Sequence, residues 1–524
     1  MILLNERILS FSLDFNSKYK LGENMFKNHP KGLPVLFFTE MWERFGFYTM
    51  IAIFVFYLQE SFGWDSATVT NIYGIFLAGV YFTPIIGGWI ADNVLGYGKT
   101  IILGAITMGI GYSMMAIPTS EPYLLFAALA VVAIGNGLFK ANISVLVGNL
   151  YSHSQLSLKD SGFNIFYMGI NIGAFYAPFA AVGIKNFFVE NYGATLAQGY
   201  NAGFAVAAAG MVISLIIFTT FKKYYKDADY QSKHVTNDEK DLVLTKEQER
   251  SRVFALLTIF AIVIFFWMAF HQNGAALSLF ARDYTDPEVG KFLFLLFDVI
   301  GLHAILFIIL GTTVALKKSS SSKSKSIGAG FAIVGVATLI YKINTLPEMG
   351  NISPEQFQVF NPMFIVLMTP VVVGIFAYLN KRGLEPSSPA KIGIGMLITA
   401  LAYVIMLVAA IGLAPVYSLN GGQSAITVSP FFLISTYFAL TIAELNLSPM
   451  GLSFVSKVAP PKMKGLLMGG WFGATAIGNY LAGFVGRYYQ QWELWQFFLI
   501  LIFFAGMASL MVLFALKKLK KAIE

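Results

Sequence analysis

Long apolar stretches recur along the whole chain, and each is about as long as a membrane-crossing helix. A helix needs about 20 mainly apolar residues to cross a hydrocarbon core of roughly 30 Å. By this criterion the pattern predicts an all-α integral membrane protein with about 14 spans. We expect them at 33–59, 67–91, 99–117, 122–149, 160–185, 199–221, 253–280, 290–316, 327–345, 356–380, 391–414, 429–456, 465–486 and 495–516.

The charges between these spans predict the topology. Lys and Arg in short loops favour the cytoplasmic side of a membrane. With the N-terminus inside, the basic residues fall almost entirely in inside loops: Lys99, Lys159, the cluster in 222–252, Lys317, Lys318, Lys323, Lys325, Lys381, Arg382, Lys391, Lys457, Lys462, Lys464 and the terminal "KKLKK". The outside loops hold mainly acids or no charge, apart from Arg282 and Lys291. Both termini are therefore predicted to be cytoplasmic.

The composition agrees with a membrane protein. Of 524 residues, 56% are hydrophobic and 12% charged, whereas soluble domains carry roughly 25% charged residues. The mean hydropathy is +0.67. The net charge of +8 is interpreted as cytoplasmic loop charge and not as a nucleic-acid surface. The absence of cysteine excludes disulfides, thiolate metal sites and a cysteine nucleophile, and the N-terminal residues lack the continuous apolar run of a cleaved signal peptide.

The spans divide into two groups. We expect a cytoplasmic N-terminal segment (1–32), a six-helix bundle (33–221), a cytoplasmic linker (222–252), a second six-helix bundle (253–516) that includes an inserted helix pair at about 290–345, and a cytoplasmic tail (517–524). The loop "GGWIADNVLGYGKT" (87–100) has the form G-x-x-x-D-x-x-G-x-[RK] and resembles the signature loop of the major facilitator superfamily. In that fold a cavity opens between the halves and is exposed to either side in turn.

Three charges lie inside the first span, in "FFTEMWERFGFYTMIAIFVF" (37–56). At spacings of three and four residues, Glu40, Glu43 and Arg44 share one helix face, which Tyr48 extends by a turn. A charge at the bilayer centre costs about 2.5–3.5 kcal/mol on insertion scales. One interpretation is an internal salt bridge that fixes helix packing; the other is a functional site.

Further ionisable residues in other spans favour the functional interpretation. Lys140, His271 and Glu444 each stand alone in an apolar stretch and would be costly in isolation. Around one cavity, Arg44 and Lys140 face three carboxylates, so one acid lacks a cation. An unpaired carboxylate in a low-dielectric site tends to take up a proton. The simplest matching ligand is a zwitterion, with its carboxylate toward the two cations and its amine toward Glu444.

Several motifs then resemble one family. "EMWERFGFYTM" looks like the E-x-x-E-R-F-x-Y-Y motif of the proton-coupled oligopeptide transporters, and "FYMGINIGAF" (166–175) is similar to their F-Y-x-x-I-N-x-G signature. "GNGLFKANIS", "NPMFIV", "RGLEPSSPAK" and "AELNLSPMGLSFVSKVAP" also resemble segments of that family, in the same order. The resemblance covers residues 33 to 487 and implies the major facilitator fold.

The resemblance also implies roles for matching residues. Glu40 and Glu43 are expected to carry the proton, with His271 as a further candidate because histidine titrates near pH 6.5; a satisfied structural histidine is the alternative. Arg44 and Lys140 are expected to receive the peptide carboxylate, and Glu444 and Asn361 its amino end. The expected lining of the cavity is Tyr48, Tyr81, Tyr167, Asn171, Trp267 and Ser448.

The chain also departs from the family pattern. Phe47 replaces the first of two tyrosines. An arginine and an acid that many bacterial members carry are replaced by Ile51 and His271, and losing both partners of a buried ion pair can be nearly neutral. The inserted pair follows the Trp267 span, whereas bacterial members usually have it between the halves. Its Asp298 and His303 are interpreted as packing or lipid-edge groups, with a second proton site as the alternative.

Together these features predict a symporter in the cell (inner or plasma) membrane that imports di- and tripeptides with protons by alternating access. No cofactor, metal site or catalytic residue is expected besides the coupling proton, and a monomer suffices. Alternatives are a proton symporter of the same fold for nitrate or a modified amino acid, a membrane-embedded enzyme and a non-transporting sensor. A buried acid suited to an amine favours peptides over a pure anion. The sequence contains no G-x-x-x-x-G-K-[ST] loop for a nucleotide.

Overall fold

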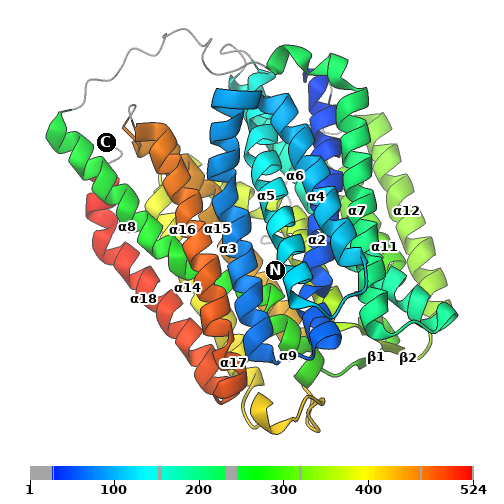
Figure 1. The fold of residues 1–524 in the computed structure, drawn as a ribbon. Coiled ribbons are helices and arrows are strands. Elements are labelled where there is room, and N and C mark those ends of the chain that lie inside the picture. Colours follow the sequence, from blue (N-terminus) through cyan, green and yellow to red (C-terminus); the bar gives the residue numbers. More distant parts are fainter. Residues whose placement is uncertain are drawn as a thin grey trace.

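Helices make up nearly all of the structure (Figure 1). The computed structural model describes residues 26, 29–151, 156–229, 245–317, 321–460 and 463–521. Most of the predicted N-terminal segment, the middle of the predicted linker and the last three residues of the predicted tail lie outside this description.

The first half of the chain forms a bundle of six long helices. They are α2 (Gly32–Phe62), α3 (Ser66–Ile90), α4 (Tyr97–Ala116), α5 (Pro122–Asn149), α6 (Leu156–Tyr192) and α7 (Leu196–Thr220). A short π-helix, η1 (Ala91–Leu95), lies in the signature loop between α3 and α4, where Asp92 accepts a hydrogen bond of 2.6 Å from the Tyr97 hydroxyl. The short 3₁₀ helices η3 (Lys222–Tyr224) and η4 (Lys226–Ala228) follow α7.

The second half forms another six-helix bundle with two extra helices. Its long helices are α8 (Lys246–Phe270), α13 (Phe360–Lys381), α14 (Ser388–Ala409), α15 (Phe431–Val458), α16 (Lys464–Gly486) and α18 (Leu494–Lys521). Shorter elements are η6 (His271–Gly274), α9 (Ala276–Tyr284), η7 (Pro354–Val359), η8 (Val416–Ser418) and α17 (Tyr488–Gln491). The extra helices are α11 (Val299–Leu316) and α12 (Ser322–Thr345).

The long helices agree with the predicted spans in number, and most of them agree in place. Within the described residues, 13 helical segments are long and apolar enough to cross a membrane. The one predicted span without a counterpart in that set is the thirteenth, 465–486, which corresponds to α16, a glycine-rich helix of 23 residues. The fold is therefore an all-α membrane fold of two six-helix bundles with an inserted pair.

The inserted pair begins later than the sequence predicted. Residues 290–298 are not part of a long helix, because β1 (Glu288–Gly290) pairs antiparallel with β2 (Met349–Asn351) and the short helix α10 (Lys291–Phe294) follows. Asp298 caps α11 by accepting a 2.6 Å hydrogen bond from the amide of Gly301. Its other oxygen pairs with Lys342 of α12 at 3.0 Å. The pair lies at one edge of the molecule, on the right in Figure 1.

The seventh predicted span is not one continuous helix. It is broken after α8 by η6, and Ala275 has the non-helical angles φ −117° and ψ −101° before α9 begins. Gly274 lies against Tyr73 of α3, so closely that a Cβ at this position would be 2.1 Å from the tyrosine hydroxyl. This backbone contact between the halves favours a break where apolar periodicity alone predicted a helix.

The halves meet along two helix pairs. In one, α3 packs on α16, where a Cβ on Gly74 would be 2.5 Å from the Cα of Gly483. In the other, α6 contacts both η7 and α13. One end of the bundle contains the end of α2 and the start of η7. We call it the outer end, since the charge pattern predicts that it faces outside. It lies at the bottom of Figure 1, near the labels α9, α17, β1 and β2.

Candidate functional site

The three charges of the first span form one buried cluster on α2. Arg44 Nε lies 3.2 Å from Glu40 Oε1, and its NH2 group donates to Glu43 Oε1 at 2.7 Å. Arg44 Nε also donates to Glu43 Oε2, which makes this pair bidentate. All three residues are at most 2% exposed. A single guanidinium thus serves two carboxylates, as the helical spacing predicted.

Two groups that sequence reasoning missed lie beside this cluster. Asn136 of α5 is fully buried, and its side-chain amide lies 3.4 Å from Glu43 Oε1. Tyr112 of α4 interacts electrostatically with Glu43 and Arg44, and its buried hydroxyl has no hydrogen-bond partner in the described part of the chain. Asn136 stands one helical turn before Lys140, and this spacing is the signal that could have identified it.

The second cation lies near the first cluster. Lys140 of α5 interacts electrostatically with Glu40 and Glu43. Its ammonium is 4.0 Å from the centre of the Tyr81 ring on α3, within the range of a cation–π interaction. Tyr81 thus contacts Lys140 within the first six-helix bundle.

The buried acid of the second half has a defined partner. The side-chain amide of Asn361 on α13 donates to Glu444 Oε2 on α15 and to Thr441 Oγ1, each at 3.0 Å. Thr441 was not predicted, although it stands three residues before Glu444 on the same helix face. Ser448, one turn further along α15, is half-buried. Asn361 and Glu444, which come from different predicted spans, are thus brought together.

Two tyrosines lie within electrostatic range of Glu444. Tyr48, one turn after Arg44, interacts electrostatically with Arg44, Tyr81 and Glu444. Tyr167 of α6 interacts with Glu444, Tyr48 and Tyr81. Tyr167 is 40% exposed, although several ionisable groups lie near it. Asn171, one turn later, is buried and its amide donates to the backbone carbonyl of Tyr167, within α6.

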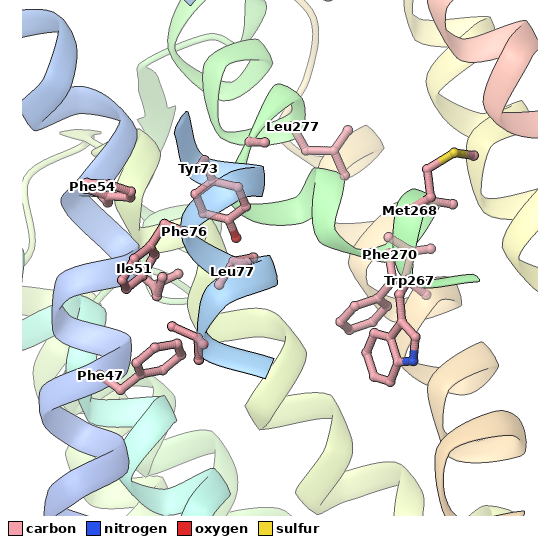
Figure 2. Close-up of a cluster of buried hydrophobic side chains, with 14 of the residues drawn as sticks. Phe47, Ile51, Phe54, Tyr73, Phe76, Leu77, Trp267, Met268, Phe270 and Leu277 are labelled. Carbon is pink, nitrogen blue, oxygen red and sulfur yellow. The ribbon is translucent and has the colours of Figure 1, made fainter. Parts of the chain in front are cut away.

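Trp267 and His271 face the first half from α8 and η6. Their rings stack with centres 5.3 Å apart, and His271 lies 6.1 Å from the Tyr81 ring of the other half. In Figure 2, Trp267 and Phe270 project toward side chains of α2 and α3, including Phe47 and Ile51. The Nε2 atom of His271 and the Nε1 atom of Trp267 are buried without a hydrogen-bond partner within the described residues.

The site brings charged groups of both signs to the junction of two bundles. No three His, Cys, Asp or Glu side chains in the described segments are close enough to hold a metal ion. The fold and this polar centre define a class of protein, a polytopic membrane carrier of the major facilitator type. Comparison with known proteins then identifies the family within that class.

The chain belongs to the POT family, whose model matches residues 98–246 and 335–494. It is 31% identical to an uncharacterized transporter, YclF, of Bacillus subtilis over 90% of this chain and 92% of that protein. It is 30% identical to the dipeptide and tripeptide permease A of Yersinia pestis over 89% and 86% of the respective chains.

Solved structures agree with this assignment. A peptide transporter POT in complex with sulfate matches with a TM-score of 0.72 and 26% identity, over 98% of this chain and 99% of that one. A mutant of a peptide transporter POT in complex with alafosfalin matches with a TM-score of 0.72 and 27% identity over the same shares. With this family and its many spanning helices, the chain is a multi-pass plasma-membrane protein.

Proposed function

We propose that this protein is a proton-coupled symporter that imports di- and tripeptides by alternating access, and that it is not an enzyme. The observation that carries the proposal is that buried charges lie in both halves, with Arg44 paired to two carboxylates in the first and Glu444 bound by Asn361 in the second. A zwitterionic peptide has a carboxylate for Arg44 and Lys140 and an amine for Glu444 and Asn361. The relatives named dipeptide and tripeptide permeases support the same substrate class.

Each site residue takes a role that follows from its position. Glu40 and Glu43 compete for a single guanidinium, so either can accept a proton while the other stays paired with Arg44. Proton arrival therefore changes how many charges Arg44 must neutralise. This frees the guanidinium to interact with a peptide carboxylate, which links proton and peptide binding.

The remaining residues form the walls of the site. Tyr48, Tyr81, Tyr167 and Trp267 offer aromatic surfaces and polar tips that suit varied peptide side chains. Asn171 and Ser448 are assigned to the edges of the same space. His271 is a second candidate for proton exchange, because its imidazole has an unpartnered nitrogen at the junction of the halves.

The proton gradient supplies sufficient energy for accumulation. A proton crossing 100 mV gains about 2.3 kcal/mol, and each pH unit adds about 1.36 kcal/mol. Roughly 3 kcal/mol of this drive supports accumulation on the order of a hundredfold at one proton per neutral solute. No nucleotide or other cofactor is required.

Uptake of labelled dialanine into proteoliposomes tests the proposal. We expect accumulation that depends on an inward proton gradient, with competition by unlabelled tripeptides but not by nitrate. Competition by nitrate with none by peptides would instead assign the chain to an anion substrate. Absence of uptake for all of these solutes would favour a sensor.

A further inference from the structure

A second charged cluster joins the halves at the outer end, away from the site described above. Lys185 of α6 and Glu355 of η7 form an ion pair with 2.7 Å between Nζ and Oε1. The side chains are only 7% and 1% exposed. The pair therefore connects the first half to the second through a contact with little access to solvent.

A third residue completes the contact. The hydroxyl of Tyr200 on α7 donates to the same Glu355 oxygen at 3.0 Å. The Lys185 ammonium also lies 5.4 Å from the centre of the Tyr200 ring. Glu355 is thus held by two groups of the opposite half, while its other oxygen has no hydrogen-bond partner within the described ranges.

The segment that carries Glu355 is itself well anchored. Ser353 and Gln356 form a capping box at the start of η7. The side-chain amide of Gln356 donates to the carbonyl of Phe297, just before α11, at 2.9 Å. The carboxylate is therefore held by a short, fixed segment that is tied to the base of the inserted pair, and it cannot follow α6 freely if the halves separate.

The energetics of such a pair depend on the state of the carrier. Removing one partner of a buried ion pair strands the other charge at a cost of about 3–5 kcal/mol. When both groups meet water, each is hydrated and the attraction between them is weak. The closed conformation therefore requires both partners, because a lone buried charge favours the opening that hydrates it.

We infer that Lys185 and Glu355 form the latch that holds the outer end closed, and that they separate each time the cavity opens to that side. Tyr200 positions the Glu355 carboxylate for this contact. The inference rests on the proposed function, since alternating access requires an outer opening. It adds a gating role for residues that lie outside the peptide site.

The absence of cysteine makes the test direct. Spin labels on Glu190→Cys and Ala414→Cys, two exposed outer-end positions in different halves, report the opening of this end by electron paramagnetic resonance without any peptide. In Glu355→Gln, we expect the ratio of the long-distance (open) to the short-distance (closed) population to rise on the order of tenfold or more. Combining Lys185→Glu with Glu355→Lys should return the ratio toward that of the parent.

Two further variants keep the test decisive. If Glu355→Gln fails to fold, Tyr200→Phe removes only the hydroxyl donor and should raise the same ratio on the order of threefold. Lys291→Ala breaks an outer-end ion pair of equal length, 2.7 Å, in which Glu348 is 83% exposed and both partners belong to the second half. This control should leave the distances unchanged.

The outcomes separate this inference from the proposed function. Unchanged distances in both Glu355→Gln and Tyr200→Phe would overturn the latch, even if dialanine uptake is normal. A shifted population in a chain that fails to take up dialanine would support the latch and contradict the peptide assignment. An equal shift in Lys291→Ala would also overturn it, because any lost outer-end charge would then have the same effect.

Discussion

Asn361 donates its side-chain amide to Glu444 at 3.0 Å, and this contact joins α13 to α15. The amide occupies one lone pair of a carboxylate that is 9% exposed. Among the described residues no cation forms an ion pair with Glu444, so a peptide ammonium can fill that position. The predictions below follow from this arrangement and from its counterpart on α2.

Replacing Glu444 should lower the affinity for ligands with a free amine more than the affinity for ligands with a blocked amine. Glu444→Ala removes a charged acceptor, and a hydrogen bond to a charged group contributes about 1.5–3 kcal/mol. We expect dialanine affinity to fall on the order of ten- to a hundredfold, with little change for N-acetylated dialanine. Competition binding to the purified protein measures both. Equal losses for the two ligands would exclude the amine contact.

The aromatic ring of Tyr81 should contribute more to dialanine affinity than its hydroxyl does. Tyr81→Leu removes the aromatic face beside Lys140, a contribution of about 0.5–2 kcal/mol in this kind of contact. The apparent affinity for dialanine is expected to fall roughly two- to thirtyfold. Tyr81→Phe is the matched control and should stay close to the parent. Equal losses in Tyr81→Phe and Tyr81→Leu would instead assign the role to the hydroxyl.

His271 can be tested without disturbing its stack on Trp267. His271→Phe keeps an aromatic ring at the 5.3 Å contact but removes both nitrogens. If the imidazole exchanges protons, gradient-driven uptake of dialanine should fall at least about tenfold while exchange of labelled for unlabelled dialanine persists. Unchanged uptake would leave His271 with a packing role only.

Close packing of the halves predicts a position-specific effect of alanine. A Cβ on Gly74 meets the backbone of Gly483 at 2.5 Å, whereas on Gly79 of the same helix the nearest atom is 3.8 Å away. Gly74→Ala should destabilise the protein by about 1–3 kcal/mol, as overpacking does. Gly79→Ala should have an effect within about 0.5 kcal/mol. Thermal unfolding in detergent compares the two, and similar melting temperatures would contradict the tight contact.

The sequence predicted the parts of the site that depend on local spacing. The helical period places Glu40, Glu43 and Arg44 on one face. Charged residues are rare inside a membrane span, so these three could be recognised as candidate site residues. The family motifs located Lys140, Asn361 and Glu444 on separate helices, but the 3.0 Å contact of Asn361 with Glu444 is visible only in the fold. The roles of these residues in transport stay predictions.

The features that the sequence missed depend on tertiary contacts. Lys185 and Glu355 stood at the ends of two predicted spans, where charged residues are ordinary, and nothing local indicates that they pair across the halves. The break at Ala275 coincides with the packing of Tyr73 on Gly274, a contact that apolar periodicity does not predict. The late start of α11 reflects the pairing of β1 with β2, in which each strand has only three residues.

In the proposed mechanism the coupling proton binds an acid that shares Arg44, and Glu43 is the better buried of the two candidates, with 0% exposure. Glu43→Gln keeps the shape but cannot release a proton. It should abolish accumulation driven by a proton gradient while leaving dialanine counterflow intact. Glu60→Gln, outside the site near the end of α2, is the control and should retain both activities. Retention of both by Glu43→Gln would remove Glu43 from the coupling mechanism.

The most direct test of the account is the proton movement that dialanine itself produces. Proteoliposomes that contain the unmodified protein and an internal pH dye, with no imposed pH gradient and an inside-negative potential, are given external dialanine. The account predicts internal acidification that requires the protein, saturates with dialanine and is absent with nitrate or N-acetylated dialanine. Accumulation of labelled dialanine with no accompanying acidification would contradict it.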